Sequence, residues 1–395
     1  MAKLLMITGL GSAEDLASGK KGAFYNTLEE FHKYWDRIDI ISPKLKGYKS
    51  ETKKLFGNVY IHVSPWPLIF HPIWFIKKGL EIYKEEKFDL MTVHEFPPFY
   101  NGIGARLLWQ KIKVPYVLEI HHIPGYPKAG NIKEKMYRKL MSMFIRFDAK
   151  RAKAVRVVNQ KETPNFLIKA GVPADKIIYI PSAYIDLSVF KPMDLPKKYD
   201  LIFVGRLVEN KGINLFVEAV KQLNVKALIV GDGPLYDKIK FEIINSKLEI
   251  KLHGWAKDSL EVAELINKSK ILVMPSYNEG GPRVVVEAMA CGVPVLATPV
   301  GIVPDLLKNG PDTHENSGGA IEDPRFANHA LHEANRDRGG EIIAWEPEDI
   351  AKKARGLLND PARYNKISGE AIEIAKQFEK KSAIKNYADK LKSIL

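Results

Sequence analysis

Residues 270–298 read KILVMPSYNEGGPRVVVEAMACGVPVLAT. An apolar run, a polar loop, a helix-compatible stretch, a Cys-Gly turn and a second apolar run follow one another. Apolar runs that flank a helical segment are typical of the βαβ unit of a parallel sheet. Pro282 fits the first position of the helix, and Gly280 and Gly281 leave its N-terminus open to an anion. The stretch therefore predicts a doubly wound α/β fold.

The same alternation recurs along the chain in two series. We expect strands at residues 3–8, 37–42, 59–64, 88–94, 116–122, 154–159 and 176–182, and then at 199–205, 226–233, 249–254, 270–276, 293–299 and 341–346. Two such series predict two tandem Rossmann-like domains with a cleft between them. The stretch 181–198 holds three prolines and no clear period, so we expect the domains to span residues 1–183 and 187–380. A last helix at about 381–395 follows, and its pattern leaves open whether it packs back on the first domain.

The composition is that of a globular protein, with 46% hydrophobic and 27% charged residues. The single cysteine, Cys291, excludes a disulfide framework and suits a reducing compartment. The first residues, MAKLLMITGLG, read as a strand that ends in a glycine turn rather than as a signal peptide, and no run of 18 apolar residues occurs. We therefore expect a cytoplasmic protein.

Basic residues are concentrated in the first half of the chain. Residues 1–180 hold 30 Lys and Arg against 17 Asp and Glu, so they account for the whole formal net charge of +13. Such a half suits an anionic partner, which is a nucleic acid, an acidic membrane surface or a phosphorylated acceptor. The stretches 64–87 and 131–153 combine apolar and aromatic residues with Lys and Arg. They favour peripheral contact with the inner face of a membrane. The alternative is that each stretch packs one face in the core and leaves the other face in solvent.

Residues 311–340 break the alternation because they are polar and rich in Asn, His, Asp and Gly. We expect a long loop with a short helix at 325–335. His314, His329 and His332 lie there, but their spacing matches no usual set of metal ligands. We expect this insertion to lie away from the carboxyl ends of the strands, where such sheets bind ligands.

Two cations follow the first strand of the second series. Gly205 ends the strand, Arg206 comes next, and Lys211 precedes a helix. Arg and Lys at a strand end suit a clamp on a diphosphate, although a surface pair with Glu209 explains them equally well. Another strand ends in Asp232-Gly233, which indicates backbone approach to a ligand or an ordinary turn.

Two carboxylates belong to the stretch quoted first. Glu279 lies on the loop before the expected helix, and Glu287 lies within the helix among apolar residues. A buried carboxylate is costly unless strong donors satisfy it. The hydroxyls of a bound ribose would do so, and so would a Lys or Arg of a neighbouring strand. Cations for phosphate and carboxylates for hydroxyls together suit a nucleotide diphosphate sugar.

The second half resembles the donor domain of the retaining GT-B glycosyltransferases of family 4. The matching residues are Gly205-Arg206, Lys211-Gly212, Val-Gly-Asp-Gly-Pro at 230–234, Pro275-Ser276, Glu279, the run EAMACGVPV at 287–295, and Gly301, Pro304 and Asp305. The resemblance implies that Arg206 and Lys211 neutralise the leaving diphosphate. It implies that Glu279 holds sugar hydroxyls and Glu287 the ribose, with N–H groups near Gly280, Gly281 and Pro282 supporting the phosphate or the sugar. Pro282-Arg283 stands where many members have Phe-Gly, and Arg283 would add a third cation or face outward.

The first half resembles the acceptor domain of the same family more weakly. The glycine-rich first loop holds Gly11, Lys20, Lys21 and Gly22, and its lysines either meet a phosphate or are simply exposed. His94 ends one expected strand, and His121 and His122 end another. The resemblance implies that His121 contacts a hydroxyl of the donor sugar. Asp-x-Asp does not occur, which favours charge neutralisation by Arg and Lys without a metal ion.

The resemblance, together with these residues, implies a retaining, metal-independent hexosyltransferase of glycan biosynthesis. It would move a sugar from a UDP- or GDP-linked donor to a glycan or lipid-linked acceptor on the basic domain, with no separate cofactor. A nucleotide-sugar epimerase on the same fold is an alternative, and product analysis with donor alone separates the two. A basic nucleic-acid-binding protein is another, although the carboxylates of the site would repel a phosphate backbone.

Overall fold

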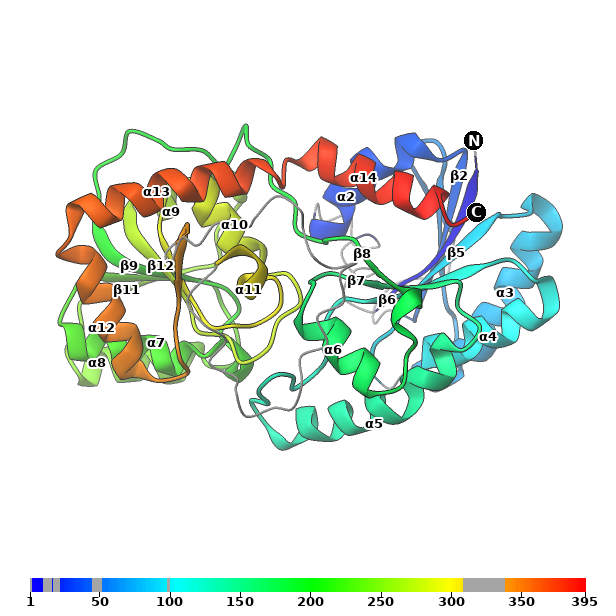
Figure 1. The fold of residues 1–395 in the computed structure, drawn as a ribbon, viewed down its shortest axis with the longest axis horizontal. Helices are drawn as coiled ribbons and strands as arrows, with labels where there is room; N and C mark the ends of the chain where they lie inside the picture. The colour runs from blue at the N-terminus through cyan, green and yellow to red at the C-terminus, as the bar shows by residue number, and fades with distance from the viewer. Residues whose placement is uncertain (1, 10–15, 17–21, 45–51, 98–99, 308–337) are drawn as a thin grey trace.

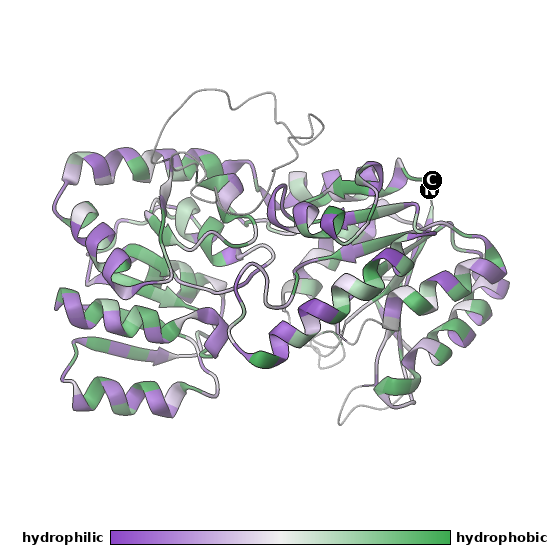
Figure 2. Cartoon of the chain, turned by 60° about the horizontal axis from the view of Figure 1, so that its bottom comes forward, coloured by the Kyte–Doolittle hydropathy of each residue, from purple (hydrophilic) through white to green (hydrophobic). Residues whose placement is uncertain are grey.

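The computed structural model describes residues 2–9, 16, 22–44, 52–97, 100–307 and 338–395. It shows two α/β domains, each built on one largely parallel sheet with helices on both faces (Figure 1). Hydrophobic residues dominate the strands, whereas the helices alternate between hydrophobic and hydrophilic residues (Figure 2). This is the pattern of parallel strands buried on both faces by amphipathic helices. The predicted fold class is confirmed.

The first sheet has the strand order β3-β4-β2-β1-β5-β6-β7-β8. Its strands are β1 (Lys3–Ile7), β2 (Arg37–Ser42), β3 (Thr52–Leu55), β4 (Val59–Val63), β5 (Leu90–His94), β6 (Tyr116–Ile120), β7 (Ala154–Val157) and β8 (Ile177–Tyr179). All pairs are parallel except β3 with β4, which is antiparallel. Our expectation missed β3, whose sequence TKKL alternates between exposed and half-buried positions. A short strand with lysines at a sheet edge lacks the apolar run that marks a central strand.

Helices cover both faces of this sheet. These helices are α2 (Ala23–Phe31), α3 (His71–Glu86), α4 (Tyr100–Ile112), α5 (Ile132–Ala149) and α6 (Glu162–Lys169). Short 3-10 turns occur at His32–Tyr34, Leu68–Phe70 and Ala174–Lys176. One core lies under α3, α4, α5 and α6 and includes Phe75, Leu108 and Ile145. The core on the other face includes Leu28 and Phe31 of α2.

The second sheet has the order β11-β10-β9-β12-β13-β14, and its pairs are parallel. Its strands are β9 (Tyr199–Val204), β10 (Ala227–Val230), β11 (Ile250–Gly254), β12 (Ser269–Met274), β13 (Val295–Ala297) and β14 (Gly340–Ile342). Its helices are α7 (Ile213–Leu223), α8 (Tyr236–Asn245), α9 (Ser259–Asn267), α10 (Arg283–Ala290), α11 (Val303–Leu306), α12 (Pro347–Leu358) and α13 (Pro361–Lys376), with a 3-10 turn at Glu209–Lys211. The helices α9, α10 and α13 lie on one face, and α7, α8 and α12 lie on the other (Figure 1).

The chain crosses twice between the domains. The linker after β8 leads into the second domain, and the segment after α13 leads back. The two crossings pair, because Ile185 N–H donates to Phe378 O at 2.7 Å and Lys380 N–H donates to Ile185 O at 2.9 Å. Helix α14 (Lys380–Lys392) then packs beside α2 on the first sheet, where the rings of Tyr387 and Phe31 stack at 4.8 Å (Figure 1).

The predicted polar loop at 311–340 lies almost wholly outside the described residues, as do the helix expected at 325–335 and His314, His329 and His332. Gly340 itself begins β14, which ends at Ile342, so the strand that we expected at 341–346 is earlier and shorter. Within the described part of the chain, no helix combines the length and the apolar character needed to cross a membrane.

Candidate active site

The loops that carry the predicted donor residues meet at one edge of the second sheet. Strand β9 lies between β10 and β12, so the carboxyl ends of the three strands are adjacent. Arg206 follows β9, Asp232 and Gly233 follow β10, and Glu279 follows β12. This edge is where doubly wound sheets bind ligands. The topology therefore gathers residues that lie up to 73 positions apart in the chain.

Glycine lets these loops pack backbone against backbone. Gly212 has a φ of +67°, and Gly231 has a φ of +140°. A Cβ on Gly212 would collide with Pro275 O, and one on Gly231 would collide with Gly205 O. Both positions therefore require glycine for space as well as for conformation.

The two predicted cations differ in their environment. Lys211 Nζ bonds to the Glu279 carboxylate, which also accepts a hydrogen bond from Ser276 Oγ at 3.1 Å. Arg206 is exposed and has no ion-pair partner in the described ranges. Lys211 and Glu279 are thus brought together as a pair, whereas the Arg206 guanidinium faces solvent. A bound diphosphate would share Lys211 with Glu279 and add Arg206.

Helix α10 begins one residue later than we expected. Pro282 has a ψ of 100° and is the N-cap, so the first helical residue is Arg283. The prediction that Pro282 opens the helix is wrong by that residue, because its backbone is still extended. Gly280 and Gly281 lie just before the cap, as predicted, so the N–H groups of the first turn remain near the loop of Glu279.

Glu287 and Arg283 lie one helical turn apart on α10. Glu287 is half-buried; burial raises the pKa of its carboxyl, and the charge of Arg283 opposes this. Glu287 has no ion-pair partner among the described residues, so a salt bridge to a neighbouring strand does not satisfy it there. Arg283 stacks over the ring of Tyr184 in the linker at 4.1 Å, and its buried Nε lacks a partner in the described structure.

Three histidines lie at the facing edge of the first sheet. His94 ends β5, and His121 and His122 follow the neighbouring strand β6. The rings of His94 and His121 stack at 4.4 Å with an angle of 25°. Burial lowers the pKa of His94 to about 4, and it lowers the pKa of His121 and His122 too. All three imidazoles are therefore neutral near pH 7.

His121 carries a polar atom without a partner. About 36% of its side chain is exposed, yet Nε2 itself is buried and has no hydrogen bond within the described parts of the chain. Glu119 Oε2 lies 3.9 Å from this nitrogen, which is too far for a hydrogen bond. Buried polar atoms are normally paired. Nε2 thus lies on the buried side of the ring near Glu119, and the exposed part of the side chain belongs to other atoms of His121.

A buried charge network behind His121 was missed by the sequence analysis. Glu119 Oε1 accepts hydrogen bonds from Arg156 at 2.8 Å and from Tyr387 of α14 at 2.5 Å. Arg156 also donates to Ile180 O at 3.2 Å and to Pro181 O at 3.3 Å. The signal was present, because YVLEIHH and AVRVVN each hold one charged residue in an apolar strand, and the two residues pair in register. The contribution of Tyr387 has no such signal.

The two edges meet at Gly280. A Cβ on Gly280 would collide with His121 O, so the donor loop rests against the backbone of the predicted catalytic histidine. Asn278 Nδ2 donates to Glu134 Oε2 of α5 at 2.9 Å, which adds a side-chain contact between the domains.

Two further carboxylates make contacts between the two domains. Glu162 Oε2 accepts from Gly301 N at 2.8 Å, and Asp305 Oδ2 accepts from Gln160 N at 2.8 Å. Burial raises the pKa of Asp305 to about 6, and burial together with the nearby charge of Asp305 raises the pKa of Glu162 well above its usual value. Asp305 was predicted only as a family match, and Glu162 was not predicted.

The glycine-rich first loop is described only in part. Gly22 is the N-cap of α2, as its place before an expected helix suggested. Gly11, Lys20 and Lys21 lie outside the described residues. The described Gly9 faces the ring of His94, whose Nδ1 would lie 3.2 Å from an added Cβ. No group of three or more potential metal ligands occurs in the described ranges.

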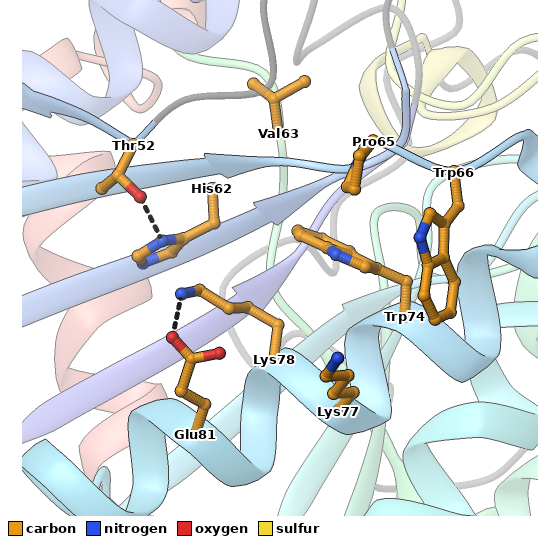
Figure 3. Close-up of a pocket in the computed structure, with 9 residues that line it drawn as sticks. All are labelled: Thr52, His62, Val63, Pro65, Trp66, Trp74, Lys77, Lys78 and Glu81. Atoms are coloured by element: carbon orange, nitrogen blue, oxygen red, sulfur yellow. Dashed lines mark hydrogen bonds and ion pairs between the residues drawn. The ribbon is translucent and has the colours of Figure 1, made fainter.

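A cavity of about 270 Å³ lies elsewhere, at the outer edge of the first domain (Figure 3). Trp66, Trp74 and Lys77 line it, and Lys78 Nζ pairs there with Glu81 at 2.5 Å. It is lined by none of the predicted site residues. The predicted site is thus defined by converging loops rather than by this cavity.

Known proteins share both the sequence pattern and the fold. Residues 24–184 match the family model Glycosyltransferase Family 4, and residues 189–334 match the model Glycosyl transferases group 1. An uncharacterized glycosyltransferase of Methanocaldococcus jannaschii is 27% identical over 349 residues, which cover 87% of each chain. Together the two models match more than half of this chain, which therefore belongs to the family 4 glycosyltransferases.

Solved structures agree in fold. Sucrose-phosphate synthase from Thermosynechococcus elongatus matches with a TM-score of 0.77 at 17% identity, covering 100% of this chain and 99% of that one. The Anabaena protein HepE in complex with UDP and glucose matches with a TM-score of 0.70 at 19% identity, covering 100% of both chains. These matches confirm the GT-B fold, and the family match shows that the chain is a glycosyltransferase. The comparisons do not favour the epimerase or the nucleic-acid-binding alternative.

Proposed function

We propose that this glycosyltransferase is a retaining, metal-independent hexosyltransferase that uses a UDP- or GDP-linked sugar. The donor domain is the second, at residues 187–380, and the acceptor domain is the first, at residues 1–183. The HepE structure with UDP and glucose supports a nucleotide diphosphate sugar as donor, because that protein has the same fold. The basic first half supports a phosphorylated or lipid-linked glycan as acceptor.

The roles of the donor residues follow from their charges. Arg206 and Lys211 hold the diphosphate and stabilise the charge that develops as it leaves. Glu279, held by Lys211 and Ser276, accepts hydrogen bonds from sugar hydroxyls. Glu287 accepts hydrogen bonds from the ribose hydroxyls. Such bonds would stabilise the ionised carboxylate and so oppose the effect of burial, which raises its pKa.

The transfer step exchanges two bonds at the anomeric carbon. The bond to the diphosphate oxygen breaks, and the acceptor oxygen forms a new bond on the same face. The acceptor proton passes to the departing phosphate oxygen, so the step needs no protein base. Neutral His121 contacts a sugar hydroxyl through the exposed part of its side chain, and its backbone contact with Gly280 places it beside the donor loop.

One observation carries the proposal. Gly280, in the loop of Glu279, packs against the backbone oxygen of His121, so the predicted donor loop and the predicted catalytic histidine lie side by side at the domain junction. Predicted half-sites from both domains that meet at one junction suit a ligand that bridges the domains.

We also propose that the protein works in the cytoplasm and contacts the inner face of a membrane. The basic first domain and the single buried cysteine, Cys291, support this placement.

A donor panel tests the proposal. The protein is heated with each of several UDP- and GDP-sugars, and slow hydrolysis of each donor is measured with and without EDTA. We expect one donor to raise Tm and to be hydrolysed to the sugar of unchanged anomeric configuration, with no effect of EDTA. An inverted anomer would exclude retention, an epimer formed from donor alone would exclude transfer, and inhibition by EDTA would exclude metal independence.

The clamp has its own test. Because Arg206 is exposed and unpaired within the described structure, Arg206→Ala should leave Tm unchanged and lower turnover by about 10²–10³-fold. Lys211→Ala should lower turnover similarly but also release the Glu279 carboxylate. Unchanged turnover in both variants would disprove the clamp.

A further inference from the structure

Part of the circumference of helix α5 is exposed, and this exposed arc contains an apolar stripe. Its exposed apolar side chains are Ile132 (83%), Met136 (52%), Met143 (63%), Phe144 (37%) and Phe147 (45%). At 3.6 residues per turn, all of these except Phe144 fall within about 60° of the helix circumference. They therefore form one stripe rather than scattered surface residues. The core-facing side of the helix is separate and carries Met141 and Ile145.

The charged residues around this stripe differ in exposure according to their sign. The exposed charged residues of α5 are Lys133, Lys135, Lys139 and Arg146, and all of them are basic. The only acids of the helix, Glu134 and Asp148, are half-buried and buried respectively. Figure 2, in which the bottom of Figure 1 comes forward, shows hydrophobic and hydrophilic residues alternating along α5. The exposed arc therefore offers apolar and cationic groups without a carboxylate.

Helix α4 and the residues after α5 extend this surface. The Arg106 guanidinium lies 3.8 Å from the ring centroid of Phe147 and donates to Phe147 O at 3.2 Å. The centroid of the Trp109 ring lies 4.4 Å from Lys113 Nζ and 5.5 Å from Arg151 Cζ. Aromatic rings close to Lys and Arg suit the boundary between lipid headgroups and acyl chains.

We propose that the exposed arc of α5, with the adjoining face of α4, docks this protein on an anionic lipid surface. The apolar stripe enters the headgroup region, and the flanking cations meet lipid phosphates. Charge complementarity selects this occupant. A second copy of the chain fits poorly, because a twofold interface on this face would bring together two surfaces whose exposed α5 charges are all basic.

The surface is linked directly to the donor loop. Asn131 caps α5 by accepting from Glu134 N at 2.9 Å, and Glu134 Oε2 accepts from Gly130 N at 2.8 Å and from Asn278 Nδ2 at 2.9 Å. Asn278 immediately precedes Glu279. The first turn of the docking helix therefore contacts the loop of the predicted donor site. This link rests on the proposed function, and it places a lipid-borne acceptor beside that loop.

Vesicle binding tests the docking surface without any sugar. The full-length protein is sedimented with phosphatidylcholine vesicles that contain or lack phosphatidylglycerol, at low and high salt. We expect binding only to the anionic vesicles, weakened by salt. Lys139→Ala and Arg146→Ala should each weaken binding about fivefold, and the double variant Met143→Asp/Phe147→Asp should weaken it by at least about tenfold.

A matched control lies on the second domain. Phe241 and Ile244 of α8 are 67% and 65% exposed, so Phe241→Asp/Ile244→Asp makes the same chemical change on a different surface. This variant should bind as the wild type does, and all variants should keep the wild-type Tm and rate of donor hydrolysis. Equal binding to neutral vesicles, undiminished binding by the α5 double variant, or a dimer that this variant dissociates would overturn the proposal. Loss of donor hydrolysis in every protein, with vesicle binding intact, would instead refute the proposed function.

Discussion

Gly280→Ala is the sharpest test of the domain junction. The added methyl would lie far closer than 3.0 Å to His121 O and 2.8 Å from His121 C. Both crowded groups are backbone, so neither can rotate away, and no left-handed φ adds a separate cost. The loop of Glu279 and the strand end of His121 must separate by more than about 1 Å, and a misplacement of that size costs about 100-fold in rate. We therefore expect turnover of the hydrolysed donor to fall about 100-fold.

Gly281→Ala is the matched control. Its methyl would meet Ser182 Oγ at 3.0 Å, and that side chain can rotate. We expect it to keep turnover within a few-fold of wild type, measured by donor hydrolysis at saturating donor, with Tm recorded for both variants. Equal turnover in Gly280→Ala and wild type at equal Tm would show that this contact does not position the site. An equal loss in both variants would show that any bulk in the loop is harmful and that the His121 contact is not special.

Two further predictions concern stability. Burial raises the pKa of Asp305 from 3.8 to about 6, so the folded state binds a proton that the unfolded chain releases in this range, and stability falls as pH rises from about 4 to 6. Asp305→Asn still accepts from Gln160 N–H, so it should raise Tm above wild type at pH 7 but not at pH 4; a constant difference between the two pH values would contradict the burial argument. Tyr387→Phe removes a hydrogen bond to the buried carboxylate of Glu119, so it should cost about 1.5–3 kcal/mol in urea unfolding and lower turnover, because Glu119 faces His121. Tyr364→Phe, which loses only a bond to the carbonyl of Lys270, should cost less and leave turnover unchanged; equal effects of the two variants would argue against a positioning role.

Most of the fold was predictable because its signal is local. Central parallel strands are buried on both faces, so the runs LIFV at 201–204 and ILVM at 271–274 are apolar throughout, and amphipathic helices separate such runs. The edge strand β3 was not predictable in this way, because an edge strand needs no apolar run. The start of α10 was misplaced by one residue, because Pro282 is compatible with both the cap and the first turn.

The sequence alone determined which residue types lie at the strand ends: two cations after β9, a glycine-bounded carboxylate before α10, and histidines after β5 and β6. That information is local, since each group follows its own strand by a few residues. Tertiary structure alone decided that Lys211 pairs with Glu279, that Gly280 touches His121, and that Tyr387 of the returning α14 helix bonds to Glu119. These contacts join segments 68, 159 and 268 positions apart, and no periodicity or spacing in the chain encodes them. The first depends on the strand order of the second sheet, the second on how the two sheets come together, and the third on where the returning helix packs on the first sheet.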